Sequence, residues 1–164
     1  MPPPTAKAST VPAPDSPPFR IRRARRGDSE ALAALLRELG HTEGTDTQTV
    51  HWVISHPEIE IFVAGDPQDK PVGMISLSHR PQLRFKGRIA TIDELVVTEA
   101  WRRRGVGRAL VLHAIERAKV LSVKRLEMVA ARSRGDLMRE FCESCGFTDA
   151  DWVLYRHQDT EPKR

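Results

Sequence analysis

The chain has 164 residues, of which 40% are hydrophobic and 29% are charged, and its formal net charge is +4. This length and composition predict one globular domain with a sizeable core. Since the sequence has neither an apolar run of membrane-spanning length nor the apolar region of a secretory signal, we expect a cytoplasmic protein with no membrane partner.

The two ends of the chain differ in composition from the rest. Residues 1–18 contain seven prolines among Ala, Ser and Thr, and such a segment cannot bury a core. We therefore predict a disordered, proline-rich tail over residues 1–18, a folded domain over residues 19–157 and a polar tail over residues 158–164.

The sequence of the first half of the domain predicts three strands and two helices. Alternating apolar and basic residues favour a strand over residues 19–23. Asp28 is expected to cap a helix that ends at Gly40, and Asp46 a second helix that Pro57 stops. Strands over residues 59–64 and 72–79 are expected to form a hairpin.

The second half alternates strands and helices. The connection over residues 81–87, with Arg84, Phe85 and Lys86, is a candidate cover for a ligand site. A central strand over residues 90–97 precedes a helix over residues 105–120, and a strand is predicted over residues 125–130. The final elements are a helix over residues 135–145, with Leu137, Met138 and Phe141 facing inward, and a strand over residues 153–156. This order predicts a mixed α/β sheet with helices on both faces.

The join between the central strand and the long helix favours binding of an anion. It reads Arg102-x-x-Gly105-x-Gly107 and fits neither G-x-x-x-x-G-K-[ST] nor G-x-G-x-x-G. The first backbone N–H groups of a helix have no partner within it, and the helix dipole places partial positive charge there. The glycines allow a phosphate to come close, and the arginines add positive charge.

This segment resembles the [QR]-x-x-G-x-[GA] pyrophosphate-binding motif of the GNAT superfamily of acetyl-CoA-dependent N-acetyltransferases. The resemblance covers about residues 19–157 and includes Gly146-Phe147 after the following helix. It implies a GNAT-like fold, an α/β fold whose mixed central sheet is splayed where the cofactor enters. It also implies transfer of an acetyl group from acetyl-CoA, the donor substrate, to a primary amine.

The resemblance also implies which residues contact acetyl-CoA. The backbone N–H of Leu95 would face the thioester carbonyl, Val97 would hold the pantetheine arm, and residues 102–109 would surround the pyrophosphate. Arg103 or Arg104 would add a side-chain contact to a phosphate. The full set is Leu95, Val96, Val97, Arg102, Arg103, Arg104, Gly105, Val106, Gly107, Arg108 and Ala109.

Two adjacent carboxylates are candidates for the base that deprotonates the incoming ammonium. Strand alternation places Asp93 and Glu94 on opposite faces unless a bulge intervenes, and the family pattern favours Glu94. A carboxylate here can also bind a cationic substrate or pair with an arginine.

The group that protonates the leaving thiolate is a departure from the family pattern. Many members have a tyrosine where this chain has Cys142, so Cys142, solvent and Tyr155 are all candidate acids. With no second cysteine pair, Cys142 and Cys145 are expected to be two reduced thiols, and no metal site is predicted.

The acceptor is expected to be a small-molecule amine. The segment from Leu77 through the Gly105 loop is similar to bacterial members that act on small molecules, including aminoglycoside-type acetyltransferases. Alternatives are a protein or peptide N-acetyltransferase and a non-catalytic acyl-CoA-binding regulatory module. Nucleic-acid binding is disfavoured because no aromatic residues alternate with the arginines, and a monomer or homodimer is expected. Candidate acceptor contacts, each of which can also be a plain surface residue, are His41, Glu43, His51 and His56.

Overall fold

The computed structural model describes residues 18–40, 46–130, 135–150, 153–155 and 157. These residues belong to two compact units, Met1–Val129 and Ala130–Arg164. The predicted tails lie outside the described residues, except for Pro18. No described helix is both long and apolar enough to cross a membrane.

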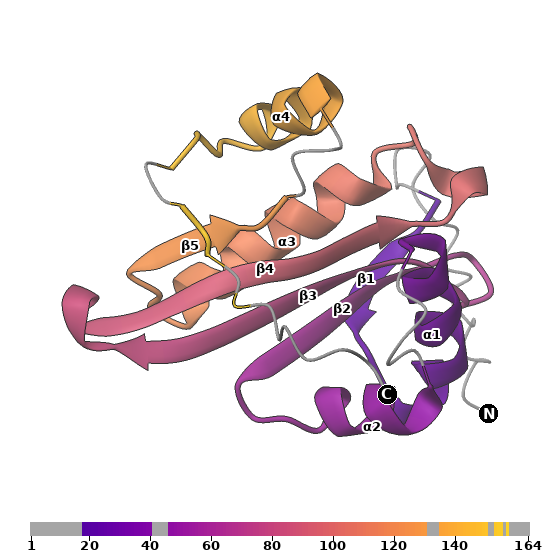
Figure 1. Ribbon diagram of the computed structural model, residues 1–164. Helices are drawn as coiled ribbons and strands as arrows, with labels where there is room; N and C mark the ends of the chain where they lie inside the picture. Colours follow the sequence, from indigo (N-terminus) through magenta and orange to yellow (C-terminus); the bar gives the residue numbers. More distant parts are fainter. Residues whose placement is uncertain (1–17, 41–45, 131–134, 151–152, 156, 158–164) are drawn as a thin grey trace, which may run out of the picture. The chain divides into compact units, whose positions relative to one another are not determined.

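The first unit is built on one five-stranded sheet (Figure 1). Its strands follow the chain in order: β1 (Arg20–Arg23), β2 (Ile59–Gly65), β3 (Pro71–Gln82), β4 (Gly87–Val97) and β5 (Arg125–Met128). Neighbours among β1 to β4 are antiparallel, whereas β5 runs parallel to β4. The predicted mixed sheet is therefore confirmed.

Helices cover both faces of this sheet, as predicted. On one face, Ile61 and Val63 of β2 pack with Leu32 in a buried cluster formed with two helices, α1 (Ser29–Glu38) and α2 (Thr47–Ile54). On the other face, the Phe62 ring meets the ring of His113, from α3 (Val106–Val120), at a centroid distance of 4.6 Å. Successive side chains of a strand point to opposite faces, which explains this division.

The N-terminal end of α3 lies close to the sheet because β3 has a glycine beneath it. A Cβ on Gly73 would lie 3.2 Å from Cγ1 of Val106 and 3.3 Å from Cδ1 of Leu110. Val106 and Leu110 are almost completely buried. Gly73 thus permits the close packing that fixes where α3 begins.

One of the two predicted helix caps is confirmed. The Asp46 carboxylate accepts a hydrogen bond from the Thr49 N–H at 2.9 Å and caps α2. Asp28 stands at the start of α1, but the prediction that its carboxylate caps that helix is wrong. This carboxylate instead accepts two hydrogen bonds from Arg22, at 2.8 and 2.9 Å, and one from the Arg25 N–H. The helix ends at Glu38, slightly before the predicted Gly40.

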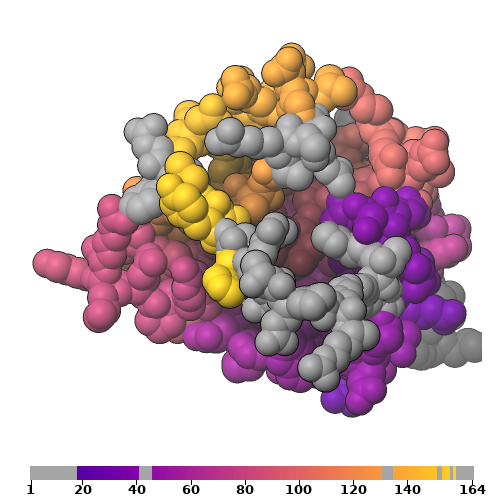
Figure 2. All heavy atoms as spheres, in the orientation of Figure 1, coloured from indigo at the N-terminus to yellow at the C-terminus, as the bar shows by residue number. Residues whose placement is uncertain are grey.

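The connection between β3 and β4 is shorter than predicted, because β3 continues to Gln82. Arg84, Phe85 and Lys86 form a tight turn around a 3-10 helix, at the end of β4 away from Val97. This turn, in rose, lies at the left of Figure 1, and its side chains project at the left of Figure 2. The Arg125 guanidinium lies 4.5 Å from the centre of the Phe85 ring and ties the turn to β5.

The second unit contains α4 (Gly135–Ser144). Met138 and Phe141 are partly buried, but Leu137 is 74% exposed, so its predicted inward orientation is wrong. The strand predicted at the end of the chain is also wrong for residues 153–155, which have no regular structure; Arg156 lies outside the described residues.

Candidate active site

The central feature of the site is a β-bulge in β4. Ser76 of β3 lies opposite Glu94, whereas the next residue, Leu77, lies opposite Ile92. Asp93 is therefore an extra residue in β4 with no counterpart in β3. The bulge changes both the faces to which side chains point and the edge to which backbone groups point.

The bulge brings both candidate carboxylates to one face of the sheet. The Ser76 hydroxyl donates a hydrogen bond to the Glu94 carboxylate and accepts one from the Glu94 N–H at 3.0 Å. The Asp93 carboxylate lies near Ser78, which acts to lower its pKa and which is two residues along β3 and therefore on the same face as Ser76. The predicted placement of Asp93 and Glu94 on opposite faces is wrong, because the extra residue interrupts the alternation.

Asp93 has a perturbed pKa. Residue Asp93 as a whole is exposed, yet the protein atoms around its carboxylate displace water and raise its pKa above the ordinary value for aspartate. Hydrogen bonds from Ser78 and the charge of Arg80 act in the opposite direction and are the weaker effects. A raised pKa makes this carboxylate a stronger base than an ordinary aspartate.

Beyond the bulge, one edge of β4 has no neighbouring strand among the described residues. Pairing with β5 ends where Ile92 lies beside Met128. The Thr98 N–H donates to the Val72 carbonyl at 2.9 Å, so it points toward β3. Backbone groups alternate along a strand, and those of Val97 and Leu95 therefore point toward the open edge. The side chain of Val96, between them, is buried against α1 and α2.

The loop between β4 and α3 turns sharply to start the helix. Gly105 precedes the helix with φ = +82°, and Arg103 has φ = +61°. The first backbone hydrogen bond of α3 runs from the Ala109 N–H to the Gly105 carbonyl, at 3.0 Å. The N–H groups of Val106 and Gly107 precede this bond and point out of the helix end. The predicted phosphate-binding geometry is therefore possible at this loop.

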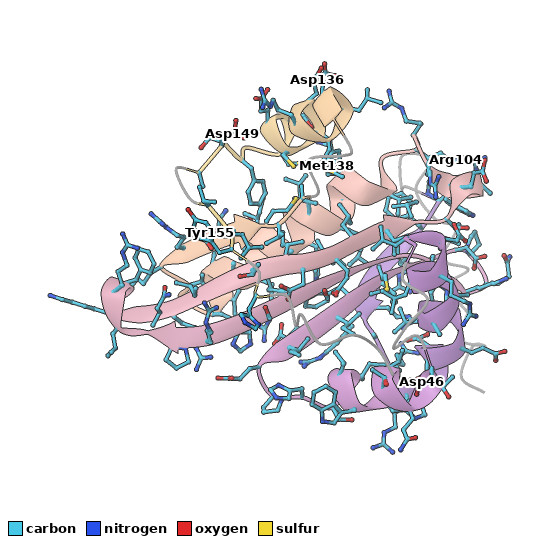
Figure 3. All side chains as sticks on the ribbon, in the orientation of Figure 1. Asp46, Arg104, Asp136, Met138, Asp149 and Tyr155 are labelled. Atoms are coloured by element: carbon cyan, nitrogen blue, oxygen red, sulfur yellow. The ribbon has the colours of Figure 1, made fainter. Side chains whose placement is uncertain are left out.

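The arginines of this loop differ in their surroundings. Arg102 donates a hydrogen bond from Nε to the Val97 carbonyl at 2.9 Å, and its Nη2 lies 3.6 Å from Oε2 of Glu38. Arg104, labelled in Figure 3, is exposed and lies over the Trp101 ring at 5.4 Å. Arg103 and Arg108 are exposed as well. The side chains of Arg103 and Arg104 can therefore contact an anion, whereas the Arg102 side chain already binds the Val97 carbonyl.

The histidines predicted near an acceptor make local contacts. His51 Nε2 lies 3.3 Å from the Arg26 carbonyl, and His56 Nδ1 accepts a hydrogen bond from the Glu58 N–H at 3.2 Å. The Trp52 ring packs edge-on against His56. His41 and Glu43 lie outside the described residues.

Three arginines of β1 and of the segment directly after it form ion pairs. Arg22 pairs with Asp28 and Asp69, and Arg25 lies 3.5 Å from Asp69. Arg23 lies 3.6 Å from the buried Glu60. These contacts join β1 to neighbouring segments and give the three arginines a structural role.

The candidate acid Cys142 lies in the second unit. It is partly buried, and burial, reinforced by the neighbouring Cys145, raises the pKa of its thiol. The two cysteines form no disulfide. Tyr155 is 88% exposed. No group of three His, Cys, Asp or Glu side chains suited to a metal ion occurs within the described residues.

Several residues of the site have no signal in the sequence. Ser76 and Ser78 lie beside the carboxylates from another strand, and Glu38 reaches Arg102 from α1. Strand alternation places these two serines on one face of β3, but it does not tell which residues of β4 lie opposite them. The contact between Glu38 and Arg102 spans 64 positions and depends on how α1 packs.

Comparisons with known proteins give one family match and several similar structures. Residues 29–147 match the model of the acetyltransferase (GNAT) family. A structure of a proposed acetyltransferase from Agrobacterium tumefaciens str. C58 is similar at 29% identity and a TM-score of 0.76, over 85% of this chain and 99% of that one. A transcriptional regulator from Bacillus halodurans C-125 is similar at 28% identity and a TM-score of 0.73, over 85% and 99%.

A more distant similarity supports the fold alone. The aminoglycoside acetyltransferase meta-AAC0020, from an uncultured soil metagenomic sample, has 19% identity and a TM-score of 0.74, over 88% of this chain and 97% of that one. A search of curated proteins gives no match.

Proposed function

Because this chain belongs to the acetyltransferase (GNAT) family, a family of acetyl-CoA-dependent N-acetyltransferases, we propose that it transfers the acetyl group of acetyl-CoA to a primary amine of a small molecule. The observation that carries the proposal is the bulge in β4. It combines two carboxylates on one face with a strand edge that has no neighbouring strand among the described residues and that leads into the loop proposed to bind an anion.

Acetyl-CoA fits the open edge and the loop that follows it. The Val97 backbone would hold the pantetheine arm as a neighbouring strand would. The N–H groups at the start of α3, with Gly105, Gly107 and Ala109 nearby, would surround the pyrophosphate, favoured by the helix dipole. Arg103 and Arg104 would add charge from the exposed side of the loop.

The reaction requires a neutral amine close to the thioester and a donor for the charge that develops on the carbonyl oxygen. The amine nitrogen bonds to the carbonyl carbon, the carbon–sulfur bond breaks, and the thiolate leaves with its electron pair. We assign the oxyanion donor to the Leu95 N–H, which points to the open edge of β4. Because the donor belongs to the backbone, substitution of Leu95 by another apolar residue should be mild.

The base is assigned to Glu94, with Asp93 beside it. An alkyl ammonium has a pKa of about 10, so a base must remove its proton before attack. The Ser76 hydroxyl donates to the Glu94 carboxylate and accepts from the Glu94 N–H, and these two bonds fix the direction of that carboxylate. Asp93, on the same face, would bind a positive charge of the acceptor, and its raised pKa also makes it the competing candidate for the base.

Cys142 is the proposed donor of a proton to the leaving thiolate. Its raised pKa keeps the thiol protonated at neutral pH, the state a donor requires. A cysteine is a weaker match to the family pattern than the usual tyrosine, and solvent can supply the same proton.

A cationic small molecule is the favoured acceptor, because two neighbouring carboxylates attract positive charge. The second candidate function is a non-catalytic regulatory module that binds an acyl-CoA. It is favoured by the cysteine at the tyrosine position and by the similarity to a structure described as a transcriptional regulator.

Two measurements test the proposal. Acetyl-CoA should raise the melting temperature, since it binds the folded state alone, and release of coenzyme A should depend on an amine from a panel of small molecules and peptides. Binding without release in the presence of any amine would favour the regulatory module. An absence of binding would refute the assignment of the loop.

The two carboxylates can be separated by variants once a good acceptor is known. Glu94→Gln should keep acetyl-CoA affinity and lower turnover by about 10²-fold or more at neutral pH, with a smaller deficit at higher pH where more amine is already neutral. Asp93→Asn should mainly raise the KM for the acceptor. The pH–rate profiles of both variants check this, and the opposite pattern would exchange the two roles.

A further inference from the structure

We infer that Glu38, at the end of α1, is a positioning residue for the cofactor-binding loop, and that it acts through Arg102. This inference rests on the proposed function, because it assigns the segment from Arg102 to Gly107 to the pyrophosphate of acetyl-CoA. It concerns a residue outside that segment and outside the base and acid.

The carboxylate of Glu38 is held between two residues that flank the 3-10 helix Glu99–Trp101. The Thr98 hydroxyl donates a hydrogen bond to Oε1 of Glu38 at 2.8 Å. The guanidinium Nη2 of Arg102 lies 3.6 Å from Oε2 of the same carboxylate. Both partners of Glu38 therefore belong to the connection between β4 and α3, whereas Glu38 belongs to α1.

The other end of the Arg102 guanidinium is fixed to β4. Its Nε donates to the Val97 carbonyl at 2.9 Å, on the open edge of the strand. One planar group thus joins the last residue of β4 to the last residue of α1. The fork geometry of arginine allows both contacts, whereas lysine could make only one at a time.

This loop has a backbone that requires support from elsewhere. Arg103 has φ = +61°, which is unfavourable for a residue with a Cβ, and Gly105 has φ = +82°. Such conformations persist where surrounding contacts determine them. The contacts of Glu38, Thr98 and Arg102 immediately precede the strained residues and hold the loop where α3 begins.

The surface around this network is an open groove lined by Glu38, Thr98, Glu99, Ala100 and Arg102. Glu38 and Glu99 are two carboxylates of the same groove, but only Glu38 contacts the Arg102 side chain. Glu99 instead contributes its backbone carbonyl to the Arg102 N–H at 3.2 Å. The chain therefore offers a matched control for the charge of Glu38.

A positioning role and a simple charge effect predict changes of opposite sign. Removing a carboxylate near an anion-binding helix end should strengthen binding of acetyl-CoA, since one repulsive charge is lost. If Glu38 positions the loop, Glu38→Ala should instead raise the Kd for acetyl-CoA by about fivefold or more, a range typical of residues in contact. Glu99→Ala, which removes the same charge without that contact, should leave the Kd unchanged or lower it.

The experiment is calorimetric titration of acetyl-CoA into the wild-type protein, Glu38→Ala, Glu99→Ala, Arg102→Met and the Glu38→Ala/Arg102→Met double variant. The effect of Glu38→Ala should persist at high salt, where charge effects are screened. It should also vanish in the Arg102→Met background, because Glu38 acts through Arg102. Melting temperatures without ligand verify that each variant is folded.

The outcomes distinguish a failure of the proposed function from a failure of the positioning role of Glu38. Wild-type protein that fails to bind acetyl-CoA would refute the proposed function. If the wild-type protein binds normally, two results would refute the positioning role and leave the proposed function intact. One is that Glu38→Ala binds acetyl-CoA as tightly as Glu99→Ala. The other is that Glu38→Ala weakens binding equally in the wild-type and Arg102→Met backgrounds.

Discussion

At the scale of single residues, the start of α3 depends on a backbone conformation that few residues adopt. Gly105 stands at φ = +82° directly before the helix, and a Cβ placed on it would meet no atom within 4 Å. Space is therefore no obstacle to a larger residue at this position. The obstacle is the conformation itself, which favours glycine.

This distinction gives a first prediction. Gly105→Ala should lower the free energy of unfolding by about 1 to 2 kcal/mol, the strain of an L residue in the left-handed region, and should weaken acetyl-CoA binding. Gly27→Ala is the control, since Gly27 also has open space around it but no positive φ. It should leave stability unchanged or raise it by up to about 1 kcal/mol. Urea denaturation measures both, and equal effects would refute the argument from conformation.

At the scale of elements, a buried ion pair joins β2 to α3. Glu60 is 4% exposed, and its carboxylate accepts two hydrogen bonds from Arg117, at 2.6 and 2.7 Å. The hydrogen bond and charge of Arg117 hold the pKa of Glu60 below its usual range. The pair lies on the face of the sheet against which α3 packs, so it aligns the helix with β2.

The second prediction follows from the burial of that carboxylate. Arg117→Met should destabilise the protein by about 2 to 4 kcal/mol, because it leaves Glu60 with only the more distant Arg23. The value is below that for a fully buried pair because Arg117 is about a third exposed. Lys119→Met, which breaks an exposed pair with Glu116 on the same helix, should change stability by less than about 0.5 kcal/mol.

A double variant makes this prediction sharper. Glu60→Met combined with Arg117→Met removes both charges and should recover most of the loss in the denaturation midpoint. If the double variant is as unstable as Arg117→Met alone, the loss comes from packing and not from an unpaired carboxylate.

At the scale of the whole molecule, a buried and a half-buried histidine make the folded state sensitive to acid. Burial, with the nearby charge of Arg88, lowers the pKa of His79, and burial with Arg117 lowers that of His113. His79 is 8% exposed and its Nδ1 lies 2.8 Å from Nη1 of Arg88, while Glu58 and Glu60 also face it and oppose the shift.

The third prediction is therefore a loss of stability on mild acidification. Below the unfolded-state pKa of about 6.5, the unfolded chain binds protons that the folded protein excludes, so stability is complete above pH 7 and falls as the pH decreases toward 5. His113→Phe keeps the ring contact with Phe62 and removes one titrating group, so its melting temperature should fall less between pH 7.5 and 5.5 than that of the wild-type protein. An identical fall in both proteins would exclude His113 as a cause.

The elements that the sequence predicted well are those with local signals. The α3 helix and its preceding loop were predicted from apolar spacing and two glycines, and they begin and end within a residue of the prediction. The Asp46 cap was likewise local and is confirmed. The Asp28 cap failed because Arg22, six residues earlier, offers the carboxylate two charged donors.

Features that depend on distant partners could not be predicted. The opposite faces expected for Asp93 and Glu94 followed from an ideal strand, and only the register against β3 reveals the extra residue. The contacts of Ser76 and Glu38 require knowledge of which segments lie side by side. The local sequence pattern predicts that a segment is a strand, whereas its register against the neighbouring strand determines which of its backbone groups face the open edge.

The bulge in β4 makes the number of residues in this strand as important as their identity. A deletion of Asp93 would leave Glu94, Leu95 and the entire loop unchanged in sequence. It would also convert β4 into a regular strand. Either the backbone N–H and carbonyl groups after Ile92 would then point to the opposite edge of the strand, or the apolar side chains would point to the opposite face of the sheet. We therefore expect this strand to tolerate substitutions at its exposed positions but not insertions or deletions.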